Sequence, residues 1–322
     1  MTRLMYVVAA SHSGSTLLSM LLNVHPKVAT AGELKAVNLG DTDGYRCSCH
    51  VLLKECPFWA DVNERMGQCG HDFSIWDAQT HFDAIDSRYV QRLLAPLVRS
   101  RMLESVRQAA LALSPAWRKG RRRLIERSVD LVNSYAHAAG VEVVAESSKV
   151  GQRLLQLARH SELDIHVVRM IRDGRAVALT YMEPEKFADA KEVALRGGGT
   201  GQSYDVKLSM SEAAREWRRS NEEAEALLPQ INPRSVTTVR YEELCADPVA
   251  TLNRIYKDAS LEPIADIGRF KEVDHHVIGN GMRLDKESHV TLDERWRCVL
   301  TKEQLAEFEE VAGALNRQYG YC

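Results

Sequence analysis

The chain has 322 residues, of which 45% are hydrophobic and 27% charged, and its formal net charge at pH 7 is −2. This is an ordinary globular composition, in a chain long enough for a sizeable core. The near-neutral charge excludes a general basic surface for nucleic acid or an anionic membrane, so a bound anion requires a local site. We therefore expect no nucleic-acid partner.

No apolar run approaches the roughly 20 residues that a membrane span needs. The apolar segment 4–10 is short and lacks the cleavage pattern of a signal peptide, so we expect it to form a buried strand. Seven cysteines, an odd number, argue against a disulfide framework and favour a reducing compartment. We expect a cytoplasmic protein without a membrane span.

In chain order, the apolar pattern predicts strands that alternate with helices. The expected strands are residues 4–10, 28–31, 141–145, 165–171 and 235–239. The expected helices are residues 17–22, with a stop near 25–26, most of 75–139 with a break at 114–115, 151–160, 174–181, 211–228, 248–259 and the tail from 301. Residues 41–59 have an irregular pattern.

This alternation predicts an α/β fold in three layers, with a central parallel sheet covered by helices on both faces. The strand, small-residue turn and helix at the start of the chain make the fold P-loop-like. We expect a single domain over 1–322, with a helical insertion at about 70–140 and a C-terminal cap. Residues 184–207, which include three consecutive glycines, are predicted to form a mobile loop.

The turn after the first strand predicts an anion site, because free backbone N–H groups and the positive end of a helix dipole meet there. Gly14 lets the backbone approach an anion closely, and nearby hydroxyls can donate further hydrogen bonds. An ordinary serine-capped connection is the alternative. The triphosphatase pattern G-x-x-x-x-G-K-[ST] is absent because no lysine precedes Thr16, which disfavours ATP or GTP hydrolysis. The candidate turn residues are Ser11, His12, Ser13, Gly14, Ser15 and Thr16.

A second strand and helix, residues 167–180, predict another anion contact. Arg172 stands at the carboxyl end of the strand, where ligands of open α/β sheets bind. Thr180 follows about two helical turns later, so the two side chains can hold one phosphate. A surface Arg–Asp pair beside an amphipathic helix is the alternative.

Together the two elements resemble the superfamily of sulfotransferases that use 3′-phosphoadenosine 5′-phosphosulfate (PAPS). Its first motif is a basic residue followed by S-G-[ST]-T, and its second is R-D-x-R-x-V-x-x-[ST]. The chain looks closest to the tyrosylprotein-sulfotransferase-like and bacterial carbohydrate-type branches. Further matching segments, in the expected order, are residues 21–26, 31–33, 146–149, 240–244 and 276–283. His12 replaces the basic residue of the first motif and is expected to be a weaker, pH-dependent cation.

The resemblance implies that the turn binds the 5′-phosphosulfate, that Arg172 and Thr180 bind the 3′-phosphate, and that Tyr241, Asn280 and Arg283 lie near the nucleotide. It also implies that Glu33 is the general base and that Lys149 neutralises the bridging oxygen of the leaving group. The alternatives are a surface glutamate and a solvated lysine. Rival bases are His50, His81, His275 and His276.

The expected reaction is in-line transfer of the sulfuryl group from PAPS to a hydroxyl or amine acceptor, with 3′-phosphoadenosine 5′-phosphate as the product. The acceptor can be a carbohydrate, a lipid, a small natural product or a peptide tyrosine, in a cleft lined by the insertion and by residues 184–207. We expect no metal requirement. Alternative functions are a kinase-like P-loop enzyme and a catalytically degenerate nucleotide-binding module.

Two other features leave alternatives open. Cys47, Cys49, His50 and Cys56 can form a zinc knuckle. Alternatively, Cys56 can form a disulfide with Cys47 or Cys49, or the three cysteines can be free buried thiols. The basic run 118–123 can attract an acidic substrate or form the solvated start of a helix.

Overall fold

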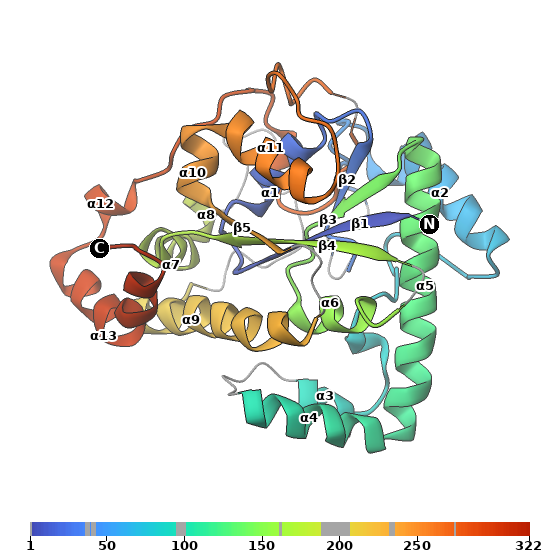
Figure 1. The fold of residues 1–322 in the computed structure, drawn as a ribbon, viewed down its shortest axis with the longest axis horizontal. Helices are drawn as coiled ribbons and strands as arrows, with labels where there is room; N and C mark the ends of the chain where they lie inside the picture. Colours follow the sequence, from blue (N-terminus) through green and yellow to red (C-terminus); the bar gives the residue numbers. More distant parts are fainter. Residues whose placement is uncertain are drawn as a thin grey trace.

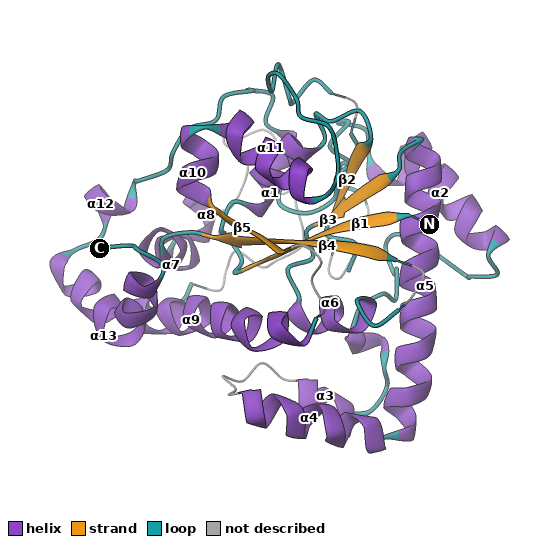
Figure 2. Ribbon diagram, viewed as in Figure 1, coloured by secondary structure: helices purple, strands orange, loops and turns teal. Residues whose placement is uncertain are grey.

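The fold is known from a computed structural model, which describes residues 2–35, 39, 43–94, 101–160, 163–187, 207–231, 236–273 and 275–322. Five parallel strands form its central sheet, in the order β2-β3-β1-β4-β5. The strands are β1 (Arg3–Ala9), β2 (Val28–Gly32), β3 (Val143–Glu146), β4 (Asp164–Ile171) and β5 (Val236–Arg240). The expected α/β fold class, with helices on both faces of a parallel sheet, is confirmed (Figure 2).

Helices cover both faces of this sheet (Figure 1). On one face lie α1 (Ser15–Leu22), α10 (Tyr241–Ala246) and α11 (Pro248–Asp258), and on the other lie α6 (Gly151–Leu157) and α9 (Met210–Leu227). The remaining helices are α2 (Pro57–Gln68), α3 (Arg88–Leu94), α4 (Arg101–Leu113), α5 (Pro115–Ala139), α7 (Gly174–Met182), α8 (Pro184–Phe187), α12 (Trp296–Val299) and α13 (Lys302–Gln318). Short 3-10 turns span Leu53–Glu55, Phe82–Ala84, Leu228–Gln230 and Gly281–Leu284.

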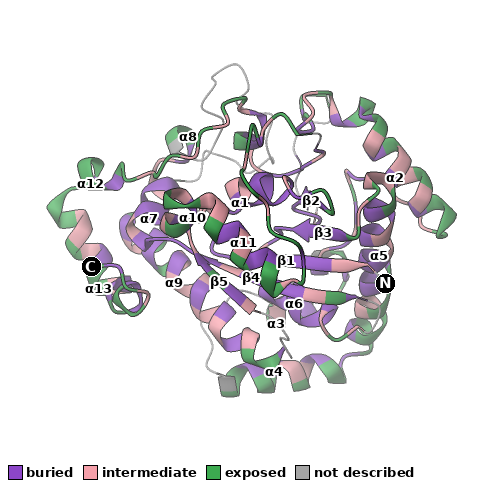
Figure 3. Ribbon diagram, turned by 45° about the horizontal axis from the view of Figure 1, so that its top comes forward, coloured by how far each residue is buried: buried purple, intermediate pink, exposed green. Residues whose placement is uncertain are grey.

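The central strand β1 shows why the sheet is buried on both faces. Leu4, Tyr6 and Val8 pack in the cluster that includes α5 and α6, whereas Met5 and Val7 pack in the cluster with α1 and α11. Successive side chains of a strand point to opposite faces, so a continuous apolar run fills both layers of core. Figure 3 shows this contrast between buried strands and the exposed outer sides of the peripheral helices.

The expected insertion is helical, and its longest element, α5, begins after the predicted break. Ser114 caps α5 by accepting a hydrogen bond from the Trp117 backbone N–H, and Pro115 occupies the first turn. The basic run 118–123 lies in the first turns of this helix, where Arg122 pairs with Glu126 on the exposed surface. This arrangement matches a solvated helix start.

At the other end of the chain, α13 packs against α7 and α9 and forms the expected cap (Figure 1). Phe308 of α13 contributes to a core cluster with Trp217 and Val177.

Two segments differ from expectation or fall outside the structure. Residues 41–59 were expected to be irregular, but α2 already begins at Pro57, because proline is pre-organised for the first helical position. Of the predicted loop 184–207, residues 184–187 form α8 and 207 is described, whereas 188–206 lie outside the described residues.

Candidate active site

The predicted phosphate turn joins β1 to α1 at the carboxyl edge of the sheet. Gly14 has φ of +88°, and a Cβ atom there would lie 2.4 Å from Cδ2 of Tyr241. Only glycine fits both the left-handed backbone and this close approach. Five of the predicted residues line one cavity of about 400 Å³: Ser11, His12, Gly14, Ser15 and Thr16. Ser13 does not line it; its buried hydroxyl has no hydrogen-bond partner among the described residues.

His12 lines the cavity but is not the expected cation. Burial, together with the charges of Lys149 and Arg172, lowers the pKa of His12 to about 3. A buried imidazole beside two positively charged side chains is not protonated near neutral pH. The ring packs edge-on against Tyr181, with centroids 4.7 Å apart, and the backbone has φ of +63°. His12 is therefore neutral near pH 7 in the ligand-free protein, and its role toward a bound anion stays a prediction.

The second predicted element reaches the same cavity. Arg172 follows β4, and its guanidinium donates to the backbone carbonyl of His12 at 3.0 Å and lies 4.3 Å from the ring centroid of Tyr241. Thr180, on α7, also lines the cavity, and its hydroxyl donates to the Ala176 carbonyl at 3.1 Å. The fold thus brings Arg172, Thr180 and Tyr241 to the turn, as the motifs predicted.

Arg172 is paired with an acidic residue, Asp293, that was not predicted from the sequence. Asp293 accepts a hydrogen bond from Arg172 at 3.0 Å through Oδ2 and a second from Arg295 at 2.7 Å through Oδ1. Burial raises the pKa of Asp293, but the hydrogen bond from Arg295 and the charge of Arg172 lower it well below its usual range. Asp293 and Arg295 both line the cavity, so an ionised carboxylate is paired with Arg172 there.

Glu33 and Lys149 form a close ion pair in this cavity. Lys149 Nζ lies 2.6 Å from Oε1 of Glu33, and Lys35 Nζ lies 3.3 Å from Oε2. Burial raises the pKa of Glu33, but the charges of both lysines and their hydrogen bonds outweigh it and lower the pKa to about 2. Glu33 is therefore ionised at neutral pH. Lys149 has φ of +66°, a left-handed conformation that costs roughly 1–2 kcal/mol for a residue other than glycine.

A buried ion pair supports the turn that carries Lys149. Glu146, the last residue of β3, accepts a hydrogen bond from Nε of Arg153 at 2.6 Å, and both side chains are almost fully buried. Arg153 also donates to the carbonyl of Thr80 and the hydroxyl of Ser128. Since removing one partner of a buried pair leaves an uncompensated charge, this network fixes the start of α6 against α5.

The two residues predicted from the C-terminal segment differ in their positions. Asn280 lines the cavity and its side chain accepts a hydrogen bond from the Met282 backbone N–H. Arg283 does not reach the cavity: it is 1% exposed, donates to the carbonyls of Gly279, Asn280 and Arg46, and lies over the Tyr45 ring. Its guanidinium is taken up by backbone carbonyls in this structure, and its contact with a nucleotide stays a prediction.

The four histidines that are alternative candidates for the general base lie in three places. His275 is buried and hydrogen-bonded to Ser48, and His276 lies among the three cysteines. His50 has φ of +67° in the turn after Cys49. Among these four, His81 alone lines a described cavity.

That second cavity, of about 450 Å³, adjoins the first. The two share Ser11 and Lys149. His81, Phe82, Gln91 and Leu94 of the insertion line one side, and Glu216, Arg219 and Glu223 of α9 line another. Lys35 also lines it, so two of its cations, Lys35 and Lys149, are the partners of Glu33. Neither Lys35 nor Arg219 was predicted from the sequence.

Comparison with known proteins identifies the family. A sequence model of the sulfotransferase family matches residues 5–266, and the chain belongs to this family. Carbohydrate sulfotransferase 5 of Mus musculus is 24% identical over 196 residues, which make up 59% of this chain and 49% of that protein. The chain thus spans about half the length of this curated relative.

Two solved structures share the fold over the whole chain. The sulfotransferase domain of the Synechococcus PCC 7002 olefin synthase has a TM-score of 0.51 at 15% identity, covering 100% of this chain and 96% of that one. The sulfotransferase domain from the curacin biosynthetic pathway has a TM-score of 0.51 at 16% identity, covering 100% and 99%. None of the described helices is long and apolar enough to cross a membrane.

Proposed function

We propose that this protein transfers the sulfuryl group of PAPS to a hydroxyl or amine acceptor. The observation that carries the proposal is the position of Lys149, which lines both cavities and holds Glu33 at 2.6 Å. A donor in one cavity and an acceptor in the other would meet at this pair. Family membership supports the reaction class, and the strand-end location of the site suits a nucleotide.

The donor would lie in the cavity of the phosphate turn. The backbone N–H groups at the start of α1 and the hydroxyls of Ser15 and Thr16 would hold the 5′-phosphosulfate. Arg172 and Thr180 would bind the 3′-phosphate, the arginine after it releases Asp293. Tyr241, beside Gly14 and under Arg172, would form the wall of this site.

The transfer would be an in-line displacement at sulfur. The acceptor oxygen forms a bond to sulfur while the bond to the bridging phosphate oxygen breaks, which leaves 3′-phosphoadenosine 5′-phosphate. Glu33 would take the acceptor proton, and Lys149 would move from Glu33 to neutralise the charge on the bridging oxygen. A free Glu33 carboxylate is a stronger base than one paired with Lys149, so binding of the donor would prepare both groups.

The acceptor would occupy the second cavity, between the insertion and α9. Its mixture of Phe82 and Leu94 with Lys35, Arg219 and Glu216 suits an acceptor with both apolar and polar parts. Carbohydrates, lipids, small natural products and tyrosine peptides have such parts. The relative named as a carbohydrate sulfotransferase makes a sugar hydroxyl the first acceptor to examine.

We further propose that the chain is one domain and acts in the cytoplasm. The residues that line the two cavities come from segments throughout residues 3–295. A division of the chain into two independent domains would therefore split the site. A reducing compartment suits cysteines that form no disulfide among the described residues.

The test is transfer of label from [³⁵S]PAPS to panels of sugars, lipids, phenols and peptides, with released 3′-phosphoadenosine 5′-phosphate measured in parallel. Equal amounts of labelled product and released nucleotide are expected. A kinase-like enzyme would instead consume ATP with the same acceptors. A degenerate module would bind the bisphosphate and release no label to any acceptor.

A further inference from the structure

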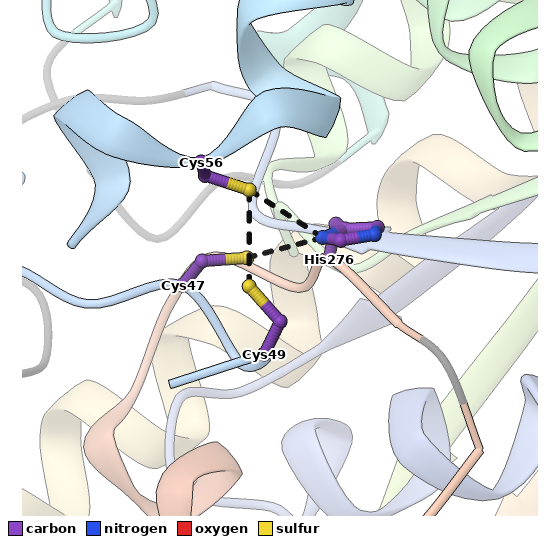
Figure 4. A group of neighbouring side chains, drawn as sticks. All are labelled: Cys47, Cys49, Cys56 and His276. Carbon is purple, nitrogen blue, oxygen red and sulfur yellow. Dashed lines mark hydrogen bonds between the residues drawn. The ribbon is translucent and has the colours of Figure 1, made fainter. Parts of the chain in front are cut away.

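Three cysteines and a histidine meet outside both cavities, at a place that the proposed reaction does not use (Figure 4). Cys47 and Cys49 lie in a hairpin closed by the bridge between Arg46 and Leu52, and Cys56 is the residue before α2. His276 comes from the C-terminal segment, 220 residues later than Cys56. The sulfur atoms and one ring nitrogen all lie within 4.8 Å of one another.

Three of the distances within this cluster match the edges of a tetrahedral zinc site. Zinc binds thiolate sulfur at about 2.3 Å and imidazole nitrogen at about 2.0–2.1 Å, so a regular tetrahedron separates two sulfurs by about 3.8 Å and a sulfur from the nitrogen by about 3.6 Å. Cys49 Sγ and Cys56 Sγ lie 3.8 Å apart. His276 Nδ1 lies 3.6 Å from Cys47 Sγ and 3.5 Å from Cys56 Sγ. We propose that Cys47, Cys49, Cys56 and His276 bind one Zn²⁺ ion.

The ligand set favours zinc over the alternatives left open by the sequence. A disulfide has a sulfur–sulfur distance of about 2.05 Å, and the pair of Cys49 and Cys56 is far beyond it. Three sulfurs and one imidazole in a tetrahedron suit zinc, whereas magnesium and calcium prefer oxygen ligands. Four protein ligands leave no open position, so the site is structural rather than catalytic.

The surroundings of Cys56 favour a thiolate, and those of His276 fix the imidazole. Cys56 stands at the N-terminus of α2, where the helix dipole stabilises a negative sulfur. The His276 ring stacks on Phe58, with centroids 4.1 Å apart and planes 9° from parallel, which sets its direction toward the sulfurs.

The site would hold together the segment that forms one wall of the active site. Ser48 joins the hairpin to this segment by accepting from the Val277 backbone N–H at 2.7 Å and donating to the His275 carbonyl at 2.9 Å. Two residues beyond His276, the Ile278 carbonyl accepts a hydrogen bond from the Glu33 backbone N–H at 3.1 Å. Zinc at His276 would therefore fix the chain from Ile278 to Asn280 without touching the reacting groups.

Metal analysis of the purified full chain tests this inference directly. Protein prepared without chelators should contain about one zinc per chain by inductively coupled plasma mass spectrometry. Cys47→Ser, Cys49→Ser, Cys56→Ser and His276→Gln should each lose most of it. Cys69→Ser, which changes an exposed cysteine at the end of α2, is the matched control and should retain the full zinc content.

A second readout does not depend on whether the variants fold. Unmodified protein from cells grown with Co²⁺ should show the visible absorption bands of tetrahedral cobalt. It should also show charge-transfer absorption from thiolate to cobalt. Zinc-free unmodified protein whose three cysteines alkylate as fast as Cys69 would overturn the proposal, and so would a disulfide between two of the three. Because metal content is measured without PAPS or an acceptor, this result is independent of the proposed reaction.

Discussion

Glu33 and Lys149 are 116 residues apart in the chain, yet Lys149 Nζ lies 2.6 Å from Glu33 Oε1. Parallel pairing of β2 with β3 accounts for this contact, because Gly32 is in register with Glu146 and each functional residue follows the end of its strand. The sheet therefore places the proposed base and the proposed leaving-group cation in contact.

Replacing Glu33 with glutamine should lower the single-turnover rate of transfer from [³⁵S]PAPS by about 10²–10⁴-fold, the usual contribution of a positioned general base. The affinity for 3′-phosphoadenosine 5′-phosphate should not fall, because the amide keeps the shape and removes only the charge. The matched control is Glu294→Gln, which removes another carboxylate of the same cavity, paired with Arg297. A Glu33→Gln rate near that of the unmodified protein would place the base elsewhere, and His81 would be the next candidate.

Replacing Lys149 with methionine should also slow transfer, because charge on the bridging oxygen is no longer neutralised. If both residues serve one transition state, the double variant Glu33→Gln, Lys149→Met should be slower than either single variant but faster than the product of the two effects predicts. The four proteins are compared by rapid-quench single turnovers. Strict additivity of the two losses would mean that the residues act in separate steps.

Replacing Asp293 with asparagine should strengthen the binding of 3′-phosphoadenosine 5′-phosphate. In the ligand-free protein the Asp293 carboxylate forms an ion pair with Arg172, and a bound phosphate would have to displace this carboxylate. Partly exposed ion pairs are worth up to about 1 kcal/mol, so the dissociation constant should fall by roughly fivefold. Isothermal titration calorimetry measures the change, with AMP as a control that lacks the 3′-phosphate. Weaker binding in Asp293→Asn would instead mean that Asp293 orients Arg172 for the nucleotide.

Replacing His12 with asparagine should reduce the acid sensitivity of folding. The pKa of His12 falls from its usual 6.5 to about 3, so between these values the unfolded chain binds a proton that the folded chain does not. The contribution of His12 to the free energy of unfolding is fully present above pH 6.5 and is lost as the pH falls toward 3. Asparagine tolerates the left-handed backbone at this position and does not titrate.

Urea unfolding at a series of pH values measures the effect of His12→Asn, with the exposed His137→Asn as the control. The stability of His12→Asn should decline less steeply below pH 6.5 than that of the unmodified protein. Parallel declines for His12→Asn and the unmodified protein would show that the imidazole becomes protonated without penalty in the folded state.

Much of the candidate site was predictable from local sequence. The turn at Ser11–Thr16 and the pair Arg172 and Thr180 each follow a strand, and parallel strands bring such positions to one edge. The strands themselves were predictable because their apolar runs are continuous. Boundaries shifted by a few residues, as at β3, which was expected from residue 141 and begins at Val143.

The rest of the candidate site, and the cysteine cluster, depend on contacts between distant residues that no local sequence pattern encodes. Asp293 reaches Arg172 across 121 residues, and His276 reaches Cys56 across 220, both through segments without regular structure. Arg283 matched a family motif, but its burial against backbone carbonyls became apparent only from the fold. The protonation of His12 likewise depends on its burial and on the cations that the fold places around it.

Nucleotide selectivity is the most direct test of PAPS as the donor. It is measured by calorimetric titration of the unmodified protein and of Arg172→Ala with 3′-phosphoadenosine 5′-phosphate, AMP and ATP. A bidentate charged contact is worth about 1.5–3 kcal/mol, so the unmodified protein should bind the bisphosphate roughly 10- to 150-fold more tightly than AMP. Arg172→Ala should lose this preference and bind both ligands alike. Equal affinity of the unmodified protein for AMP and the bisphosphate, or a preference for ATP, would contradict the assignment of PAPS as the donor.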